Sequence, residues 1–503
     1  MANRDITSIR GTIDFLKEQK ELLTIDNEVD PIYEIAGIQK ALEEGPALLF
    51  ENIKGYPGVR NIGNVFSRLD RIAKILGLDD PKKVKFKCRE AIRKPMPPKI
   101  VEQAPCQEVV ITDNIDVMAT LPIIKHSERD GGHVLGSGVN FVSGKYCEGG
   151  TEICFKRMLF RGKDWGSTFW GILSHLGKIG FVERKGERIP VTININTPPA
   201  VALVAGGGMV HSIIYVGSDE LGIAGALQGS PVEIVKAKTT DAYSIAQSEW
   251  VIEGYVDTTE RVWETEEAER VGKPGIAPFM PEWAGYMGRA VRPFKFQATA
   301  ITHRKDKPIF YTPLADSFES DFLSSVLREA CFLELAERLI PGLVIDVNTL
   351  PGMRSNASVI YQVKKRRNSD DAYLRNILSA AIDSSPGLQL AIAVDEDINI
   401  YSPNDVLWAI ATRVNADTDV VRASGGLGVG FLPSRAPGGA REITHGGGLI
   451  IDATASYASK QNFERSKYPV DRIDLKKWLT EEEIASIKAS QSEYARLVSE
   501  MGW

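Results

Sequence analysis

The stretch TEICFKRMLFRGKDWGSTFWGILSH (residues 151–175) sets three polar groups of catalytic type in an apolar, aromatic-rich run. They are the Glu152 carboxylate, the Arg157 guanidinium and the His175 imidazole. Residues 152–160 predict a buried strand, because most of their side chains are apolar. A charge inside such a strand is costly unless it is paired or binds an ion. The stretch therefore predicts a functional site built on a buried strand.

Two more carboxylates lie in similar surroundings further along the chain. Glu220 opens a predicted helix over residues 219–228, where free N–H groups could face an anion; the alternative is an ordinary first-turn glutamate. Glu282 stands between Pro281 and Trp283 in APFMPEWAGYMG. Desolvation there would favour a protonated carboxyl and a role as proton donor. The alternative is a loop glutamate bonded to backbone.

Glu152, His175 and Glu220 form a candidate metal site drawn from three elements. Two carboxylates and an imidazole suit Mn²⁺ or Mg²⁺ at a phosphate better than a thiol-seeking metal. Taken singly, His175 is more often an ordinary core or surface histidine, and Arg157 is more often a structural ion-pair member. Alternation along a strand puts residues 152 and 157 on opposite faces. Both reach one site only if a bulge intervenes or Glu152 lies at the start of the strand.

Bulk composition narrows the class of protein. The chain has 503 residues, 43% hydrophobic and 25% charged, with a net charge of −6, which predicts two or three globular domains. No basic cluster with interleaved aromatics indicates a nucleic-acid partner. No apolar run reaches the ~18 residues of a membrane span, and we expect a cytoplasmic protein. The five cysteines form no CxxC pair, so neither disulfides nor a thiolate zinc site is expected.

Hydrophobic patterning predicts an α+β or α/β multidomain fold with four parts. Residues 1–105 read as a small α/β domain with helices at 8–19, 31–45 and 70–76. Residues 106–312 are dominated by short strands, which indicates a barrel or sandwich; among them we expect strands at 152–160 and 200–205 and helices at 167–178 and 219–228. Residues 313–465 alternate helix and strand, and a glycine-rich connection follows residue 424. Residues 466–503 form a helical tail that opens on a capping box, Thr480 to Glu483.

Several long segments resemble the UbiD family of decarboxylases, and the resemblance covers nearly the whole chain. The segments are EVDPIYEIAGI (28–38), LLFENIKGYPG (48–58), RNIGNVFSRLDRIA (60–73), the strand through Arg157, the helix start at Glu220, PEWAGYMG (281–288), AVDEDINIYSPNDVLWAIATR (393–413) and NFER (462–465). The forms APCQE (104–108), MPEWAGY (280–286) and YQVKKR (361–366) resemble the aromatic-acid branch, such as protocatechuate decarboxylases.

The resemblance implies a cofactor, prenylated FMN, whose phosphate is held through Mn²⁺ (or Mg²⁺) and often K⁺. It implies a central split β-barrel that binds the flavin, and a C-terminal α/β domain with a terminal helix. The cofactor-binding residues it implies are Glu152, Ile153, Cys154, Phe155, Lys156, Arg157, Ser174, His175 and Glu220. Of these, Glu152, His175 and Glu220 are the implied metal ligands, with Glu152 standing where the family usually has Asn.

The resemblance also implies that Arg157 and Glu282 are catalytic, as part of a Glu-Arg-Glu network. The other carboxylate of that network usually lies five residues before the second, where this chain has Ala277. Glu264, Glu266 and Glu267 are candidates to replace it.

The implied function is reversible, non-oxidative decarboxylation of an aromatic or heteroaromatic acid, releasing CO₂. A flavin prenyltransferase would supply the cofactor, and a homodimer or a hexamer of dimers is expected. Two alternatives remain open. One is a carboxylase subunit of a hetero-oligomeric complex. The other is a non-catalytic, cofactor-binding family member, for which Ala277 is the main support.

Overall fold

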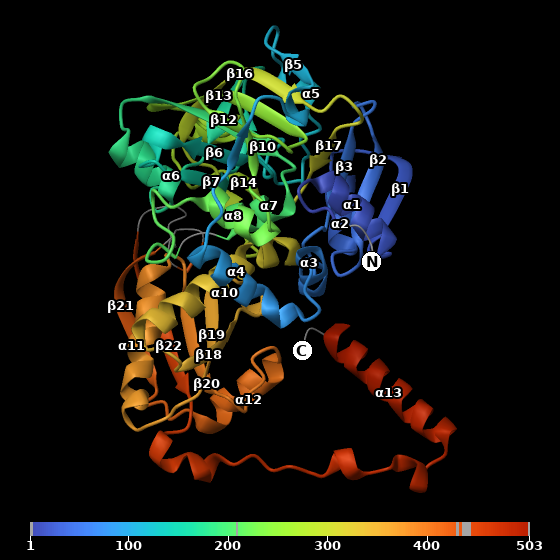
Figure 1. Cartoon of the computed structure of the whole chain (residues 1–503), viewed down its shortest axis with the longest axis vertical. Helices are drawn as coiled ribbons and strands as arrows, with labels where there is room; N and C mark the ends of the chain where they lie inside the picture. The colour runs from blue at the N-terminus through green and yellow to red at the C-terminus, as the bar shows by residue number, and fades with distance from the viewer. Residues whose placement is uncertain (1–3, 208–209, 429–431, 435–443, 501–503) are drawn as a thin grey trace. The chain divides into compact units, whose positions relative to one another are not determined.

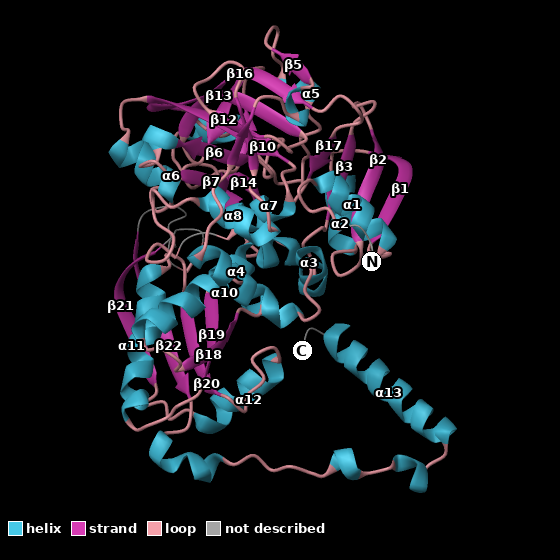
Figure 2. Cartoon of the chain, in the orientation of Figure 1, coloured by secondary structure: helices cyan, strands magenta, loops and turns pink. Residues whose placement is uncertain are grey.

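The computed structural model describes residues 4–207, 210–428, 432–434 and 444–500 (Figure 1). The chain divides into two compact units, Met1–Tyr457 and Ala458–Trp503. Figure 2 shows that the first unit mixes helices and strands throughout, as a multidomain α/β protein does. The predicted boundaries after residues 105, 312 and 465 remain predictions. Within the described residues, no helix combines the length and apolar character needed to cross a membrane.

The N-terminal part contains a four-stranded sheet and four helices. The strand order is β1-β2-β3-β17. The strands are β1 (Leu22–Val29), β2 (Ala47–Ile53), β3 (Arg60–Gly63) and β17 (Ile309–Tyr311); the helices are α1 (Ile9–Glu18), α2 (Glu34–Ala41), α3 (Leu69–Leu76) and α4 (Val84–Arg93). The three predicted helices here are confirmed, and α4 was not predicted. Because β17 arrives from much later in the chain, this sheet is completed by a strand from the middle part.

An eight-stranded sheet forms the middle part. Its order is β7-β6-β10-β13-β16-β9-β8, with β5 also paired to β16. The strands are β5 (Val109–Ile111), β6 (Val139–Ser143), β7 (Thr151–Phe155), β8 (Met158–Phe160), β9 (Trp165–Thr168), β10 (Arg188–Ile195), β13 (Trp250–Arg261) and β16 (Phe294–His303). β7 and β8 are at opposite ends of this order, yet only Lys156 and Arg157 separate them in the chain. The sheet therefore curls into a half-barrel whose end strands adjoin.

Smaller elements surround this sheet. A three-stranded sheet has the order β12-β11-β4, and β14 pairs with β15. These strands are β4 (Lys99–Val101), β11 (Glu233–Lys236), β12 (Tyr243–Ile245), β14 (Pro278–Pro281) and β15 (Met287–Arg289); the helices are α5 (Val117–Thr120), α6 (His175–Lys178), α7 (Pro199–Gly206), α8 (Glu220–Gln228) and α9 (Glu266–Val271). The predicted helix at 219–228 is confirmed as α8.

Three local predictions in this part were wrong. Residues 152–160 were predicted as one strand but are two, β7 and β8, broken at Lys156 and Arg157. Residues 200–205 were predicted as a strand and form α7; nearly every residue of α7 is apolar and buried, so its sequence shows no period. Residues 167–178 were predicted as a helix but contain the end of β9, a loop and the four-residue α6.

The remainder of the first unit is a five-stranded sheet with three helices. The order is β18-β19-β20-β22-β21. The strands are β18 (Val344–Asn348), β19 (Ser358–Val363), β20 (Leu390–Asp395), β21 (Val420–Gly428) and β22 (Thr444–Ala453); the helices are α10 (Phe318–Leu339), α11 (Ser369–Ser384) and α12 (Pro403–Arg413). The predicted alternation of helix and strand is confirmed. The glycine-rich segment after residue 424 belongs partly to β21 and β22, and most of the remainder lies outside the described residues.

Helix α10 joins the core of the middle part to that of the five-stranded sheet. Its residues from Leu323 to Ala336 are almost all buried. Close packing against α7 depends on Gly207, where a Cβ atom would lie 2.3 Å from Leu327 Cβ. The ends of α7 and α10 are therefore held near each other, beside the strand that carries Glu152.

The second unit is largely the helix α13 (Glu481–Glu500) and the segment leading to it. The predicted capping box is confirmed: Glu483 N donates to Thr480 Oγ1 (3.2 Å), and Thr480 N donates to Glu483 Oε2 (2.7 Å). The last three residues of the predicted helical tail, 501–503, lie outside the described residues.

Candidate active site

Glu152 and Glu220 lie together because the start of β7 is tied to the start of α8. Thr151 Oγ1 donates to Asp219 Oδ1 (2.6 Å) and accepts from Leu221 N (2.9 Å). Asp219 is also the N-cap of α8. The Glu220 carboxylate then accepts from Ile153 N at 2.7 Å. Glu220 therefore turns back toward the strand instead of lying along its own helix.

His175 completes this group as the first residue of α6. Ser174 caps the helix: its hydroxyl accepts from Gly177 N (3.1 Å) and donates to the Gly171 carbonyl (2.7 Å). The imidazole Nδ1 lies 3.0 Å from Glu152 Oε2 and 3.5 Å from Glu220 Oε1. The three predicted metal ligands are thus neighbours, and all three are buried.

The chemistry of this group fits a divalent cation. One donor atom from each residue lies within 4.8 Å of the others. Burial and the charge of Glu152 raise the pKa of Glu220 above its ordinary range. Burial opposes charge on His175, but hydrogen bonds to the two carboxylates outweigh it and raise the pKa of the imidazole to about 10. Two buried carboxylates beside an imidazole concentrate negative charge, which Mn²⁺ or Mg²⁺ would balance.

Arg157 is held between two carboxylates and two aromatic rings. Its Nε and Nη2 donate to Glu264 at 2.9 and 2.6 Å, and its Nη1 donates to Glu282 Oε1 at 2.9 Å. The guanidinium carbon lies 4.1 Å from the centre of the Phe279 ring and 4.9 Å from that of Phe169. A planar guanidinium paired and stacked in this way has little freedom to rotate.

Glu264 is the carboxylate that pairs with Arg157 from a second direction. Its side chain is fully buried, and it also accepts from Val291 N at 2.6 Å. The other two candidates, Glu266 and Glu267, are exposed at the start of α9. Ala277 lies in an apolar cluster instead. The sequence placed Glu264 among three candidates, and the fold brings it to Arg157.

Glu282 follows β14 and lies in the turn that leads to β15. Its N–H donates to the Tyr286 carbonyl at 2.9 Å. Gly288 leaves room for its side chain: a Cβ atom there would lie 2.6 Å from Glu282 Cγ and 2.9 Å from Oε1. The position of this carboxylate therefore depends on a glycine across the hairpin.

The carboxylate–histidine group and the Arg157 network open onto one cavity of about 380 Å³. Every residue predicted for cofactor, metal or catalysis lines it, including Ile153, Cys154, Phe155 and Lys156. The break between β7 and β8 allows Glu152 and Arg157 to share the cavity, despite the alternation of a regular strand. A cavity of this size is in the range that holds cofactors and small substrates.

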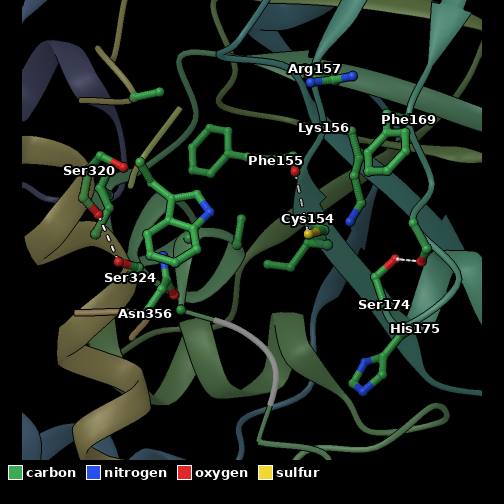
Figure 3. Close-up of a pocket in the computed structure, with 18 of the residues that line it drawn as sticks. Cys154, Phe155, Lys156, Arg157, Phe169, Ser174, His175, Ser320, Ser324 and Asn356 are labelled. Carbon is green, nitrogen blue, oxygen red and sulfur yellow. Dashed lines mark hydrogen bonds between the residues drawn. The ribbon is translucent and has the colours of Figure 1, made fainter. Parts of the chain in front are cut away.

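The opposite wall of the cavity comes from α10 and the turn before β19. Figure 3 shows Ser320, Ser324 and Asn356 across the cavity from Lys156 and His175. Arg328, which is buried, donates from Nη1 to Asn356 Oδ1 at 2.5 Å. The amide oxygen is thereby occupied and the Asn356 NH₂ group is left to face the cavity. Sequence reasoning missed this wall, because serine and asparagine carry no motif of their own.

His211 was also missed. It lines the cavity, and its ring centre lies 5.0 Å from that of His175. Burial and the neighbouring charge of His175 lower the pKa of His211 to about 4. A neutral imidazole therefore lies beside the carboxylate–histidine group. Its place between Met209 and the helix α8 gave no periodic signal in the sequence.

Three family models match successive parts of the chain. They are the N-terminal domain, the Rift-related domain and the C-terminal domain of 3-octaprenyl-4-hydroxybenzoate carboxy-lyase, at residues 13–86, 99–315 and 321–453. The first match contains β1 to β3, the second contains the eight-stranded sheet, and the third contains the five-stranded sheet. The Rift-related match contains Glu152, Arg157, His175, Glu220 and Glu282.

Known proteins resemble the chain over nearly its full length. Gallate decarboxylase of Lactiplantibacillus plantarum is 30% identical over 92% of this chain and 96% of its own. The UbiD-class enzyme HmfF of Pelotomaculum thermopropionicum, solved in complex with prFMN, aligns with a TM-score of 0.79 and 28% identity over 94% of this chain and 100% of its own. The apo 3,4-dihydroxybenzoic acid decarboxylase of Enterobacter cloacae gives 0.81 and 29%, over 94% and 98%. With three matching domain models and relatives that align from end to end, this chain belongs to the UbiD family of carboxy-lyases.

Proposed function

We propose that this protein is a carboxy-lyase that removes CO₂ from an aromatic or heteroaromatic acid with the help of prenylated FMN. The observation that carries the proposal is the single cavity that holds an Arg157–Glu282 pair and a buried Glu152–His175–Glu220 group. The Arg157–Glu282 pair is suited to binding a carboxylate and donating a proton. The Glu152–His175–Glu220 group is suited to holding a phosphate through a metal ion. Two similar proteins are named as decarboxylases of gallate and of 3,4-dihydroxybenzoic acid, which supports an aromatic acid as the substrate.

Glu152, His175 and Glu220 would hold Mn²⁺ or Mg²⁺, and the ion would bind the flavin phosphate. K⁺ is a further expected ligand of that phosphate. Residues 153–157 and Ser174 would line the flavin. When bound, prenylated FMN supplies an electron sink for the pair of electrons that the departing CO₂ leaves on the ring.

The chain's own residues would then position the acid and supply the proton. Arg157 would bind the substrate carboxylate and orient Glu282. Glu282 would deliver a proton to the ring carbon, where the electron pair of the broken bond forms the new C–H bond. Glu264 would fix Arg157 from behind, in place of the carboxylate that Ala277 lacks. General acid catalysis of this kind contributes about 10²–10⁴ in rate.

The α10 wall indicates which ring substituents fit. Ser320, Ser324 and Asn356 are polar but uncharged, and Arg328 directs its charge at Asn356 Oδ1 and Ser385 instead of the cavity. The Ser324 hydroxyl already donates to the Ser320 carbonyl at 2.9 Å. The Asn356 amide and the Ser320 hydroxyl match a ring hydroxyl, whereas a second carboxylate would be desolvated there without a cation. We therefore propose a hydroxylated aromatic acid as the substrate.

The proposal is tested with purified protein reconstituted with prenylated FMN. Absorbance and mass measurements would identify the flavin, and CO₂ release would be followed on benzoic, hydroxybenzoic, furoic and dicarboxylic acids. We expect turnover of a hydroxybenzoic acid and a loss of about 10²–10⁴ in kcat for Glu282→Gln. A Gln variant that is fully loaded with flavin and keeps its rate would refute the role of Glu282.

The same protein separates the alternatives. Release of CO₂ by the lone homo-oligomer would exclude a carboxylase that needs other subunits. The non-catalytic alternative loses its main support, because Glu264 supplies the second carboxylate on Arg157. A homodimer or a hexamer of dimers, a cytoplasmic location and a flavin prenyltransferase as cofactor supplier also belong to the proposal.

A further inference from the structure

Lys156 is a cation on the cavity wall to which the proposed function gives no role beyond lining the flavin. It follows β7 directly, and the alternation of the strand puts it on the same face as Glu152 and Cys154. Figure 3 shows its side chain turned away from Arg157, with the ammonium nitrogen on the side of the cavity where Cys154 and Ser174 lie. Lys156 therefore points toward the carboxylate–histidine end.

No carboxylate oxygen of the described residues lies within 4.0 Å of the Lys156 ammonium. Lys156 is close to the Cys154 thiol: burial raises the pKa of this thiol, and the charge of Lys156 offsets only part of the rise. Arg157, the next residue, is paired with both Glu264 and Glu282. A lysine that faces a ligand cavity is costly once the ligand displaces water, unless that ligand brings an anion.

The charges at this end of the cavity indicate the anion. Glu152 and Glu220 carry two negative charges, which a divalent ion only balances. A phosphate monoester adds about −1.5 to −2 at neutral pH. Once the phosphate is bound, this end of the cavity would therefore carry a net negative charge beside Glu152. Lys156 lies where it could balance that charge.

We propose that Lys156 binds the phosphate of the flavin and offsets the negative charge of Glu152. This inference rests on the proposed function, because it takes the phosphate to lie at the Glu152–His175–Glu220 end. It adds a direct cationic contact to a phosphate site otherwise built from a metal ion and its ligands. Charge-assisted contacts from lysine to phosphate are strong and depend little on geometry.

The test compares two flavins that differ only in the phosphate. Binding of unmodified FMN and of riboflavin to the Mn²⁺-loaded protein would be followed by flavin fluorescence, for the wild type, Lys156→Met and Lys156→Arg. We expect Lys156→Met to weaken FMN binding about 10- to 100-fold and riboflavin binding less than twofold. Lys156→Arg should stay within about threefold for both. The exposed Lys364, at the end of β19, provides the control Lys364→Met, which should change neither.

The outcomes distinguish this inference from the proposed function. Equal weakening of FMN and riboflavin would put Lys156 on the flavin ring or ribityl chain and overturn the phosphate contact. No change in either would remove Lys156 from the cofactor site while leaving that site intact. Failure of the wild type to bind FMN in the presence of Mn²⁺ would overturn both this inference and the proposed cofactor.

The charge offset has a test of its own. The double variant Glu152→Asn/Lys156→Met should bind FMN more tightly than the single variant Lys156→Met. The reason is that the repulsion from Glu152 is gone. Both variants would be measured at a Mn²⁺ concentration that saturates them, as checked by electron paramagnetic resonance. A double variant that binds no better than Lys156→Met alone would refute the offset.

Discussion

Replacing Glu264 with Gln tests whether the carboxylate behind Arg157 is part of the catalytic machinery. The pair is buried: the side chain of Glu264 is 0% exposed and that of Arg157 is 9% exposed. The change removes the charge on which two of the guanidinium hydrogen bonds depend. Breaking a buried ion pair on one side costs about 3–5 kcal/mol. We therefore expect a lower thermal-unfolding midpoint as well as a catalytic defect.

The catalytic defect is expected because the Arg157 guanidinium, once it has lost the charge of Glu264, would pair more strongly with Glu282. Without the Glu264 charge, Arg157 can give two hydrogen bonds to Glu282 in place of the one it gives now, at 2.9 Å. Stronger pairing favours the ionised form of Glu282, which cannot donate a proton. We expect kcat to fall by about 10² or more, within the range of general acid catalysis, and the limb of the pH–rate profile on which the donor loses its proton to move to lower pH.

Steady-state rates of CO₂ release from pH 5 to 9, on protein with equal flavin content, would measure both effects. Glu266→Gln and Glu267→Gln are matched controls, since both residues are exposed two and three positions away. Glu264→Asp, which keeps the charge, should recover part of the rate. A Glu264→Gln enzyme with wild-type kcat and an unshifted profile would refute the reasoning. A loss of stability alone would leave Glu264 as a structural residue.

Three further outcomes are expected. Burial raises the pKa of Glu319 to about 7 from an ordinary 4.5, although it accepts the N–H groups of Asn64 and Phe66. Between these two values the folded state binds more protons than the unfolded state. The free energy of unfolding should therefore fall by on the order of 3 kcal/mol as pH rises from about 4.5 to 7. Thermal unfolding of Glu319→Gln should depend less on pH than that of the wild type, and an unchanged pH dependence would contradict the assignment. Gly288→Ala should lower kcat about tenfold or more without weakening FMN binding, because its Cβ meets Glu282; crystallography would show whether the carboxylate moves, and an unmoved carboxylate with a normal rate would count against it. Chelation of the metal should weaken FMN binding far more than riboflavin binding, and added Mn²⁺ should restore it; a flavin affinity that is indifferent to chelation would disprove a metal-held phosphate.

The parts of the fold that could be predicted from sequence are those with strong local signals. The helix α3 has an apolar stripe and ends at Gly77, which adopts a left-handed conformation at φ 73°. The capping box before α13 and the alternation after residue 315 are of the same kind. Helix α7 was misread, because a fully apolar segment has no period.

Tertiary pairing hid other features. Helix α4 was not predicted, and one of its buried residues is Lys85, whose ammonium lies 3.3 Å from Glu329 and 3.1 Å from Asp346. Both partners come from much later in the chain, so a lysine at that position argued against a buried face. The choice of Glu264 over its two neighbours depended in the same way on where β13 ends relative to Arg157. The sequence can indicate which residues could form such ion pairs, but the tertiary structure decides which of them do.

The seam at Lys156 and Arg157 has a consequence for how this enzyme can change. Glu152 and Arg157 are five residues apart in the chain, so covalent geometry limits the separation of their Cα atoms to about 17 Å, at roughly 3.3 Å per residue. Movement of α10 relative to the curled sheet would alter the room left for a ring but not that separation. The spacing between Glu152 and the guanidinium that pairs with Glu282 therefore has a fixed upper limit. The wall across from it is the part of the cavity left to vary with the substrate.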